Sequence, residues 1–159
     1  MTRYRVVAIP DKVAATVRRT RKSPGYGHPA HAEVATGYGP CRLCLRTFQI
    51  GSDKRILFTY DPFHGHEPFP LPGPVFIHES ECERHPEDAG FPLDLVPHRL
   101  TLNAYQRGRR LVDVRYVTDG NPETTIADLL SLDDVDYIHV RDTDAGCYDF
   151  RIERETSTR

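Results

Sequence analysis

Two cysteines separated by two residues, Cys41 and Cys44, are the first side chains in this sequence with an evident chemistry. A third cysteine, Cys82, lies between two histidines, His78 and His85. Zinc takes thiolate and imidazole ligands in its tetrahedral sites, and a Cys-x-x-Cys pair on a tight turn, a zinc knuckle, supplies two of them. The sequence therefore predicts a metal site with zinc as its ion, built from the three cysteines and one histidine.

The choice of histidine depends on the segment that follows His78. A short helix over residues 79–85 would place Cys82 on one face with His78, four residues before it, or with His85, three residues after it. Pro86 limits such a helix, because the residue before a proline disfavours the helical conformation. Spacing leaves both histidines open, and the order of knuckle, hairpin and helix resembles a treble-clef zinc finger.

The cysteine pair has two other interpretations, a thiol redox pair or buried thiols without chemistry. A thioredoxin-like pair begins a helix after a strand, whereas Cys41 and Cys44 follow a Gly-Pro loop that ends at Pro40. Structural disulfides are rare in reducing compartments, so the four cysteines are better explained as metal ligands, redox groups or buried thiols.

A second candidate site is expected near the end of the chain. His139, Arg141 and Cys147 lie on two predicted strands of one hairpin, where their side chains would share a face. A thiol nucleophile, an imidazole base and an arginine that holds an anion would make a catalytic cluster. A small buried cysteine beside a turn is the structural alternative.

Two other groups of polar residues receive less weight. His64 and His66 lie in a segment rich in proline and glycine, where histidines are usually solvated, although Glu67 could act as a base toward a metal-bound water. Several arginines near Tyr105 could bind a phosphate or carboxylate, but exposed charge is the ordinary explanation. These arginines are Arg99, Arg107, Arg109, Arg110 and Arg115.

The elements that must position these residues are a mixture of strands and helices. Asp11 is a candidate cap for a helix that runs to Lys22, and Asn121 with Pro122 begins a second helix that ends near Leu130. Residues 23–40 are expected to form a loop. Strands are predicted at 4–9, 55–60, 74–78, 100–106, 109–117, 137–141 and 147–153.

These elements predict an α+β fold with a mainly antiparallel sheet, two longer helices and a knuckle-like Cys-x-x-Cys loop. In the last strand, Tyr148, Phe150 and Ile152 are expected inside, alternating with outward-facing Cys147 and Asp149. A single compact domain over 1–159 is expected. Its parts are a strand and helix at 3–22, a loop with the cysteine pair at 23–47, a hairpin and short helix at 54–85, and a hairpin, helix and hairpin at 99–154.

Composition narrows the classes of protein to which the chain could belong. With 159 residues it can bury a core without help from a metal, and a net charge of −2 disfavours nucleic acid as a partner. No apolar run approaches the roughly 20 residues that span a bilayer, and the first residues lack a signal-peptide pattern. We therefore expect a soluble, cytoplasmic protein without a membrane partner. The motifs of serine hydrolases, phosphate-binding loops and zinc proteases are absent from the sequence.

Three motifs resemble a bacterial family catalogued as domain of unknown function 1203. They are Cys41-Arg-Leu-Cys-Leu45, Gly73-Pro-Val-Phe-Ile-His78 and Gly146-Cys-Tyr148, and the likeness extends from about Gly37 to Arg154. The resemblance implies one compact domain and favours His78 over His85 as the companion of Cys82. It also implies a recurring set of polar positions: Cys41, Arg42, Cys44, His78, Cys82, Tyr105, His139, Arg141 and Cys147.

The sequence thus favours a zinc-stabilised binding or accessory module whose ligand, a small molecule or a protein, is unknown. The alternative is an enzyme, which would use an open metal site, the Cys41–Cys44 redox pair, or Cys147 with His139 and Arg141. Four protein ligands leave no position for water at a zinc ion, so a closed site favours the structural role.

Overall fold

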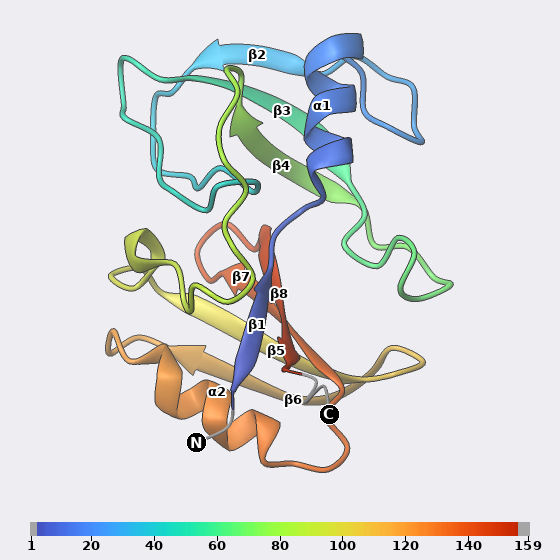
Figure 1. The fold of residues 1–159 in the computed structure, drawn as a ribbon, viewed down its shortest axis with the longest axis vertical. Helices are drawn as coiled ribbons and strands as arrows, with labels where there is room; N and C mark the ends of the chain where they lie inside the picture. The colour runs from blue at the N-terminus through green and yellow to red at the C-terminus, as the bar shows by residue number, and fades with distance from the viewer. Residues whose placement is uncertain (1–2, 156–159) are drawn as a thin grey trace. The chain divides into compact units, whose positions relative to one another are not determined.

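The protein was analysed as a computed structural model that describes residues 3–155 and divides into two compact units (Figure 1). We call residues 8–85 the cysteine unit, and residues 3–7 with 86–155 the terminal unit. Both contain antiparallel sheets and one α-helix, which confirms the predicted α+β class. The single-domain organisation stays a prediction, and each unit is described by itself.

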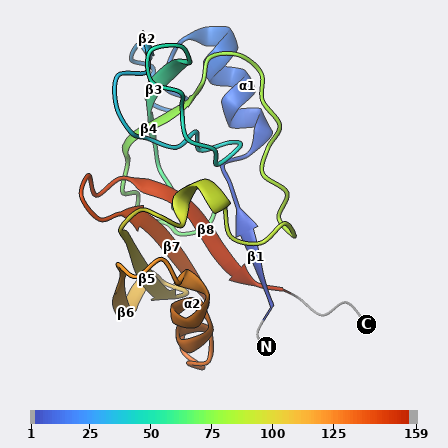
Figure 2. The ribbon, with the colours of Figure 1, turned by 90° about the vertical axis from the view of Figure 1, so that its left-hand side faces the viewer.

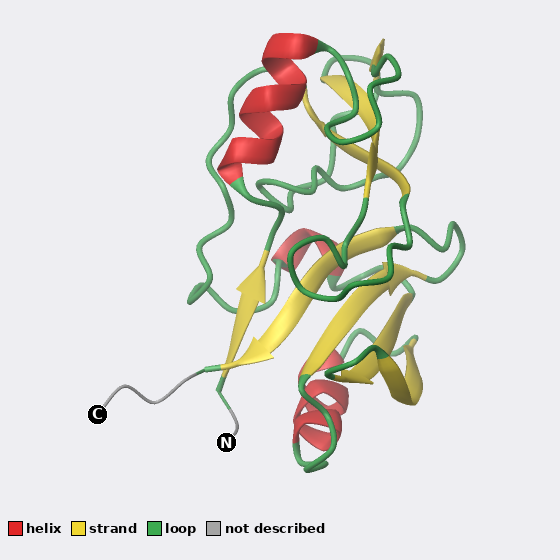
Figure 3. Ribbon diagram, turned by 90° about the vertical axis from the view of Figure 1, so that its right-hand side faces the viewer, coloured by secondary structure: helices red, strands yellow, loops and turns green. Residues whose placement is uncertain are grey.

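The cysteine unit has one helix and a three-stranded antiparallel sheet in the order β2-β3-β4. Its elements are α1 (Asp11–Thr20), β2 (His31–Val34), β3 (Lys54–Tyr60) and β4 (Gly73–His78). Ala14 and Val17 of α1 share one buried cluster with Ile56 and Ile77 of the sheet and with Cys41. The knuckle cysteines thus belong to the core of this unit. Long connections surround the strands (Figure 3).

Two predicted details of the cysteine unit were wrong. Asp11 is the first helical residue rather than the cap, and Pro10 occupies the cap position without a side-chain hydrogen bond. Residues 31–34 form β2 within the predicted loop, with His31 opposite Leu57 and Val34 opposite Lys54. Three of the four β2 residues are exposed, so this short edge strand lacks the apolar alternation that would predict it.

Residues 79–85 do not form the predicted short helix. Their backbone and side chains are held instead by contacts with distant segments. The Glu79 N–H donates to the Lys54 carbonyl at 3.0 Å, and the His85 N–H donates to the Leu43 carbonyl at 2.9 Å. Arg84 donates to the carbonyls of Ala8 at 2.7 Å and Ile9 at 2.9 Å. These contacts replace the hydrogen bonds of a helical turn.

The terminal unit is a five-stranded antiparallel sheet in the order β1-β8-β7-β5-β6, with β1, β8 and β7 side by side in Figure 2. The predicted helix and both hairpins are present, and α2 contacts β6. Its elements are β1 (Tyr4–Val7), a 3-10 turn (Leu93–Leu95), β5 (Leu100–Gln106), β6 (Arg110–Val117), α2 (Pro122–Leu130), β7 (Tyr137–Asp142) and β8 (Tyr148–Arg154). No helix within residues 3–155 is long and apolar enough to cross a membrane.

The last strand departs from the expected alternation at Asp149. Phe150 pairs with Val140 and Tyr148 pairs with Arg141, so Asp149 is an extra residue at a β-bulge. A bulge breaks the two-residue period of a strand. Asp149 is consequently fully buried rather than outward-facing, at 0% exposure.

Replacing Arg84 with methionine tests whether its contacts hold the 79–85 segment. Arg84→Met keeps an apolar stem but removes the donors to the Ala8 and Ile9 carbonyls. We expect the free energy of unfolding to fall by about 2 kcal/mol, since charged donors make strong hydrogen bonds. The matched variant Arg46→Met, at an exposed position, should change it by less than about 0.5 kcal/mol. Chemical denaturation measures both, and equal effects would contradict the assignment.

Candidate metal centre

The knuckle is a tight reversal of the chain that brings two thiols to one side. The Cys41 N–H donates to the Arg46 carbonyl at 2.9 Å, and the Leu45 N–H donates to the Cys41 carbonyl at 2.8 Å. Leu45 adopts a left-handed conformation with φ of 59°. A bridge between Pro40 and Thr47 closes the loop. The turn buries Cys41 completely and leaves Cys44 8% exposed.

Four side chains from three segments converge at this turn. Ligand atoms of Cys41, Cys44, His78 and Cys82 all lie within 4.8 Å of one another, so they can reach one metal ion. The Cys41 and Cys82 sulfurs are 3.8 Å apart, and the Cys44 sulfur lies 3.4 Å from Nδ1 of His78. The knuckle supplies two of the groups, the end of β4 supplies His78, and the irregular segment after it supplies Cys82.

The structure groups His78, and not His85, with the three thiols among the residues it describes. While Nδ1 of His78 faces Cys44, Nε2 lies 3.4 Å from Oδ2 of Asp53. The same Asp53 oxygen accepts the Gln49 N–H at 2.8 Å, which fixes the carboxylate. A carboxylate on the far nitrogen is the usual partner of a metal-binding histidine, because it sets the tautomer and the orientation of the ring.

Two donors point at the sulfur atoms. The His78 N–H donates to the Cys41 sulfur at 3.3 Å, and Nη2 of Arg18 donates to the Cys82 sulfur at 3.3 Å. Arg18 also donates from Nε to the His78 carbonyl at 3.1 Å, so α1 is tied to the cluster. Sequence reasoning treated Arg18 only as a cation at a helix end and did not consider Asp53. No local spacing relates either residue to the cysteines.

Without a metal ion, protons are redistributed among these groups. Burial alone would raise the pKa of Cys41, but hydrogen bonds from Cys44, Cys82 and His78 outweigh burial and hold that pKa far below its usual range. Hydrogen bonds with Cys41 and Cys82, together with burial, raise the pKa of Cys44. Hydrogen bonds with Cys41 and Cys82 raise the pKa of His78 to about 10. A metal ion must therefore displace protons from Cys44 and His78.

The second candidate site lies in the terminal unit. His139 is fully buried, and its ring lies 5.3 Å from the rings of Tyr105 and Tyr137 and 5.0 Å from that of Tyr148. The Arg141 guanidinium lies 5.9 Å from the Tyr148 ring centre and contacts the Gly146 carbonyl at 3.5 Å. The Cys147 sulfur lies 3.8 Å from the Ala145 carbonyl. The catalytic role of His139, Arg141 and Cys147 stays a prediction.

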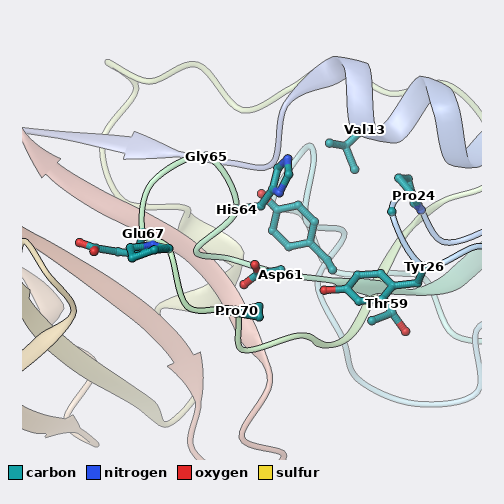
Figure 4. Close-up of a pocket in the computed structure, with 12 residues that line it drawn as sticks. Val13, Pro24, Tyr26, Thr59, Asp61, His64, Gly65, Glu67 and Pro70 are labelled. Carbon is teal, nitrogen blue, oxygen red and sulfur yellow. The ribbon is translucent and has the colours of Figure 1, made fainter.

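The two other groups of polar residues, the arginines near Tyr105 and the residues around His64, have different surroundings. Three of the arginines around the first terminal hairpin have carboxylate partners, which favours the surface-charge explanation: Arg99 with Asp144, Arg110 with Asp134 at 3.5 Å, and Arg115 with Asp113 at 2.8 Å. His64 and Glu67, by contrast, line a pocket of the cysteine unit together with Asp61 (Figure 4).

We expect Cys147 to react with iodoacetamide no faster than a cysteine in an unstructured peptide at the same pH. Its sulfur contacts a backbone carbonyl, a partner that does not stabilise a thiolate. Mass spectrometry of the native protein locates the modified residue and its rate. Faster labelling that slows in an Arg141→Gln variant would contradict this expectation and support the enzyme alternative.

Comparison with known proteins agrees with the motifs. The model of a protein family described as "Protein of unknown function (DUF1203)" matches residues 38–154. This range includes all four residues of the cluster and also His139, Arg141 and Cys147. No curated protein and no solved structure matches the chain. Because the match extends over most of the sequence, from the knuckle to the last strand, the chain belongs to the DUF1203 family of proteins.

Proposed function

We propose that the protein is a binding or accessory module whose cysteine unit is stabilised by a structural zinc ion held by Cys41, Cys44, His78 and Cys82. The distances between ligand atoms carry this proposal. Two sulfurs bound to one tetrahedral zinc at about 2.3 Å are about 3.8 Å apart, and a sulfur and a nitrogen are about 3.5 Å apart. The Cys41–Cys82 and Cys44–His78 separations are 3.8 and 3.4 Å.

The donor set favours zinc over harder cations. Three sulfurs and one imidazole suit a borderline-soft ion, whereas magnesium and calcium prefer oxygen ligands. Four protein ligands would also close the coordination sphere, which supports a structural role rather than activation of a water. Three thiolates around a divalent ion carry a net charge of −1, and the Arg18 guanidinium at the Cys82 sulfur would offset it.

The position of the cluster explains what such an ion would stabilise. The 79–85 segment has no secondary structure, and its hydrogen bonds lead to β3, to the knuckle and to the two residues Ala8 and Ile9 that precede α1. A zinc ion would join this segment to the knuckle and to the end of β4 within the core of the cysteine unit. Metal binding would then be coupled to the folding of that unit.

Metal analysis of cysteine variants tests the proposal. We expect about one zinc ion per chain in protein purified without chelator, with the ion lost in Cys41→Ser and in Cys82→Ser. Both variants should lose about 4 kcal/mol or more of unfolding free energy in the cysteine unit, because loss of a structural metal is among the most destabilising changes. Cys147→Ser, outside the cluster, should retain the ion and the stability.

Atomic emission spectroscopy and chemical denaturation provide these measurements. A metal-free wild-type protein that is as stable as one supplied with zinc would refute the structural role. A metal ion that remains fully bound in both cluster variants would refute the assignment of ligands.

Metal affinity should rise with pH. Since the pKa of His78 is raised to about 10, the imidazole is protonated at neutral pH in the metal-free protein and must lose this proton when the metal binds. We expect cobalt(II), used as a spectroscopic substitute for zinc, to bind at least about tenfold more tightly for each pH unit between about pH 6 and about pH 8. The part of this rise in metal affinity that comes from His78 should end near pH 10, because the imidazole is already neutral above its pKa.

Absorption titrations give the affinity, and calorimetry in buffers of different ionisation enthalpy counts the protons released. Cys147→Ser provides the matched control, because it should follow the wild-type dependence. An affinity that does not change with pH would contradict the assignment of a proton to His78.

A further inference from the structure

A pocket of about 440 Å³ lies within the cysteine unit, formed by the end of β3, the 23–28 turn and the 61–71 loop (Figure 4). This volume falls in the range of small-molecule sites. None of the four residues of the metal cluster lines it. The pocket is therefore a separate site in the same unit.

One wall is ordered by Asp61. Its Oδ1 atom accepts the Phe63 N–H and the Leu71 N–H, both at 3.0 Å, which draws the two ends of the loop together. Phe63 is fully buried and anchors the loop. The His64 N–H donates to the Asp61 carbonyl at 3.1 Å, and the Glu67 N–H donates to the Phe63 carbonyl at 2.8 Å. This wall is formed before any ligand arrives, which lowers the cost of binding.

The opposite wall is the turn that carries Tyr26. The Ser23 hydroxyl oxygen accepts the Thr59 N–H at 2.9 Å, and His28 contacts the Thr59 hydroxyl at 2.9 Å, which fasten the turn to β3. Gly25 supplies a φ of +82° that other residues rarely adopt. Tyr26 is 45% exposed, and its hydroxyl is directed toward Asp61 in Figure 4.

The pocket is acidic. Asp61 and Glu67 are among its twelve lining residues, all of them described, and none of the twelve is lysine or arginine. Asp61 is only 9% exposed, and its Oδ2 atom accepts no hydrogen bond from residues 3–155. Figure 4 shows its carboxylate inside the pocket, whereas that of Glu67 is directed away from Asp61. A carboxylate oxygen inside a pocket, without a hydrogen-bond partner from the protein, favours a cationic hydrogen-bond donor.

The other lining groups fit the rest of such a ligand. Tyr26 and Tyr60 present aromatic rings, which attract cations through their faces. Val13 and three prolines supply apolar surface. We propose that this pocket binds a small organic cation, a protonated amine with an apolar or aromatic body, with its ammonium group on Oδ2 of Asp61 and its body against Tyr26 and the prolines.

This inference names a ligand class for the proposed module and rests on that proposal in one respect. Val13 and Tyr60 line the pocket and also pack against the core cluster that contains Cys41 and Cys44. The pocket would therefore depend on the folding of the zinc-stabilised unit. Metal content measured on every sample separates a failure of the ligand inference from a failure of the zinc proposal.

The test uses the full chain with its metal and three probes of nearly equal shape. These are 2-phenylethylammonium, neutral 2-phenylethanol and anionic phenylacetate, titrated to millimolar concentration by calorimetry and by amide NMR. We expect the ammonium compound to bind at least about tenfold more tightly than the alcohol, as a charged hydrogen bond is worth more than about 1.4 kcal/mol. Amide shifts should be largest in the 23–28 turn and the 61–71 loop.

Two variants identify the residues responsible. Asp61→Asn keeps an oxygen for the Phe63 and Leu71 N–H groups but removes the charge, and should weaken ammonium binding about tenfold. Tyr26→Leu, at an exposed turn, should weaken it about two- to fivefold. The charge-matched control Asp128→Asn, on the exposed side of α2, should leave it unchanged.

Each outcome decides the inference. Equal or tighter binding of the alcohol or of phenylacetate overturns it, and so does undetectable binding of the ammonium compound to zinc-loaded protein. Unchanged affinity in Asp61→Asn with its metal retained also overturns it. If Asp61→Asn fails to fold, the Tyr26→Leu result decides, and shifts centred outside the pocket reject the site.

Discussion

The convergence of four candidate ligand atoms within 4.8 Å is the contact that joins three segments of the cysteine unit at one point. The strand ladder fixes only one of the contributing segments, because His78 ends β4 opposite Arg55 of β3. The knuckle is held by its own turn and bridge, and the 79–85 segment is held by a few hydrogen bonds to distant carbonyls. Irregular segments pay a large entropic cost to become ordered, and a shared metal ion is an efficient way to offset it.

Charged side chains from neighbouring elements contact residues of the cluster. Arg18 of α1 contacts the Cys82 sulfur, and Asp53, just before β3, contacts the far nitrogen of His78. Arg55 of β3 is 5% exposed, pairs with Glu33 at 3.1 Å and lies 3.9 Å from the Phe76 ring centre. These contacts connect the helix, the sheet and the candidate metal site into one electrostatic arrangement. The same helix and sheet also form part of the acidic pocket, through Val13 and Tyr60.

Local sequence patterns predicted the elements whose stability is local. The strands β3 to β8 and both α-helices agree with their β-branched residues, turn residues and helical spacing, apart from small differences at their ends. Apart from the cap of α1, where Pro10 replaces the predicted Asp11, the errors occur where distant contacts decide. β2 forms because β3 offers an edge to pair with, the 79–85 segment stays irregular because far carbonyls take its hydrogen bonds, and Asp149 is buried because a bulge shifts the register of β8.

The candidate site shows the same division. The sequence by itself determined the type of the ligands and the knuckle, because a Cys-x-x-Cys turn is a property of a few consecutive residues. The family motifs already favoured His78, but only the tertiary structure placed it against Cys44, 34 residues earlier, and brought Arg18 to Cys82 across 64 residues. It also placed the free oxygen of Asp61 opposite Tyr26 in one pocket. Such contacts follow from the packing of α1, the knuckle and the loops on the β2-β3-β4 sheet, and no short-range spacing encodes that packing.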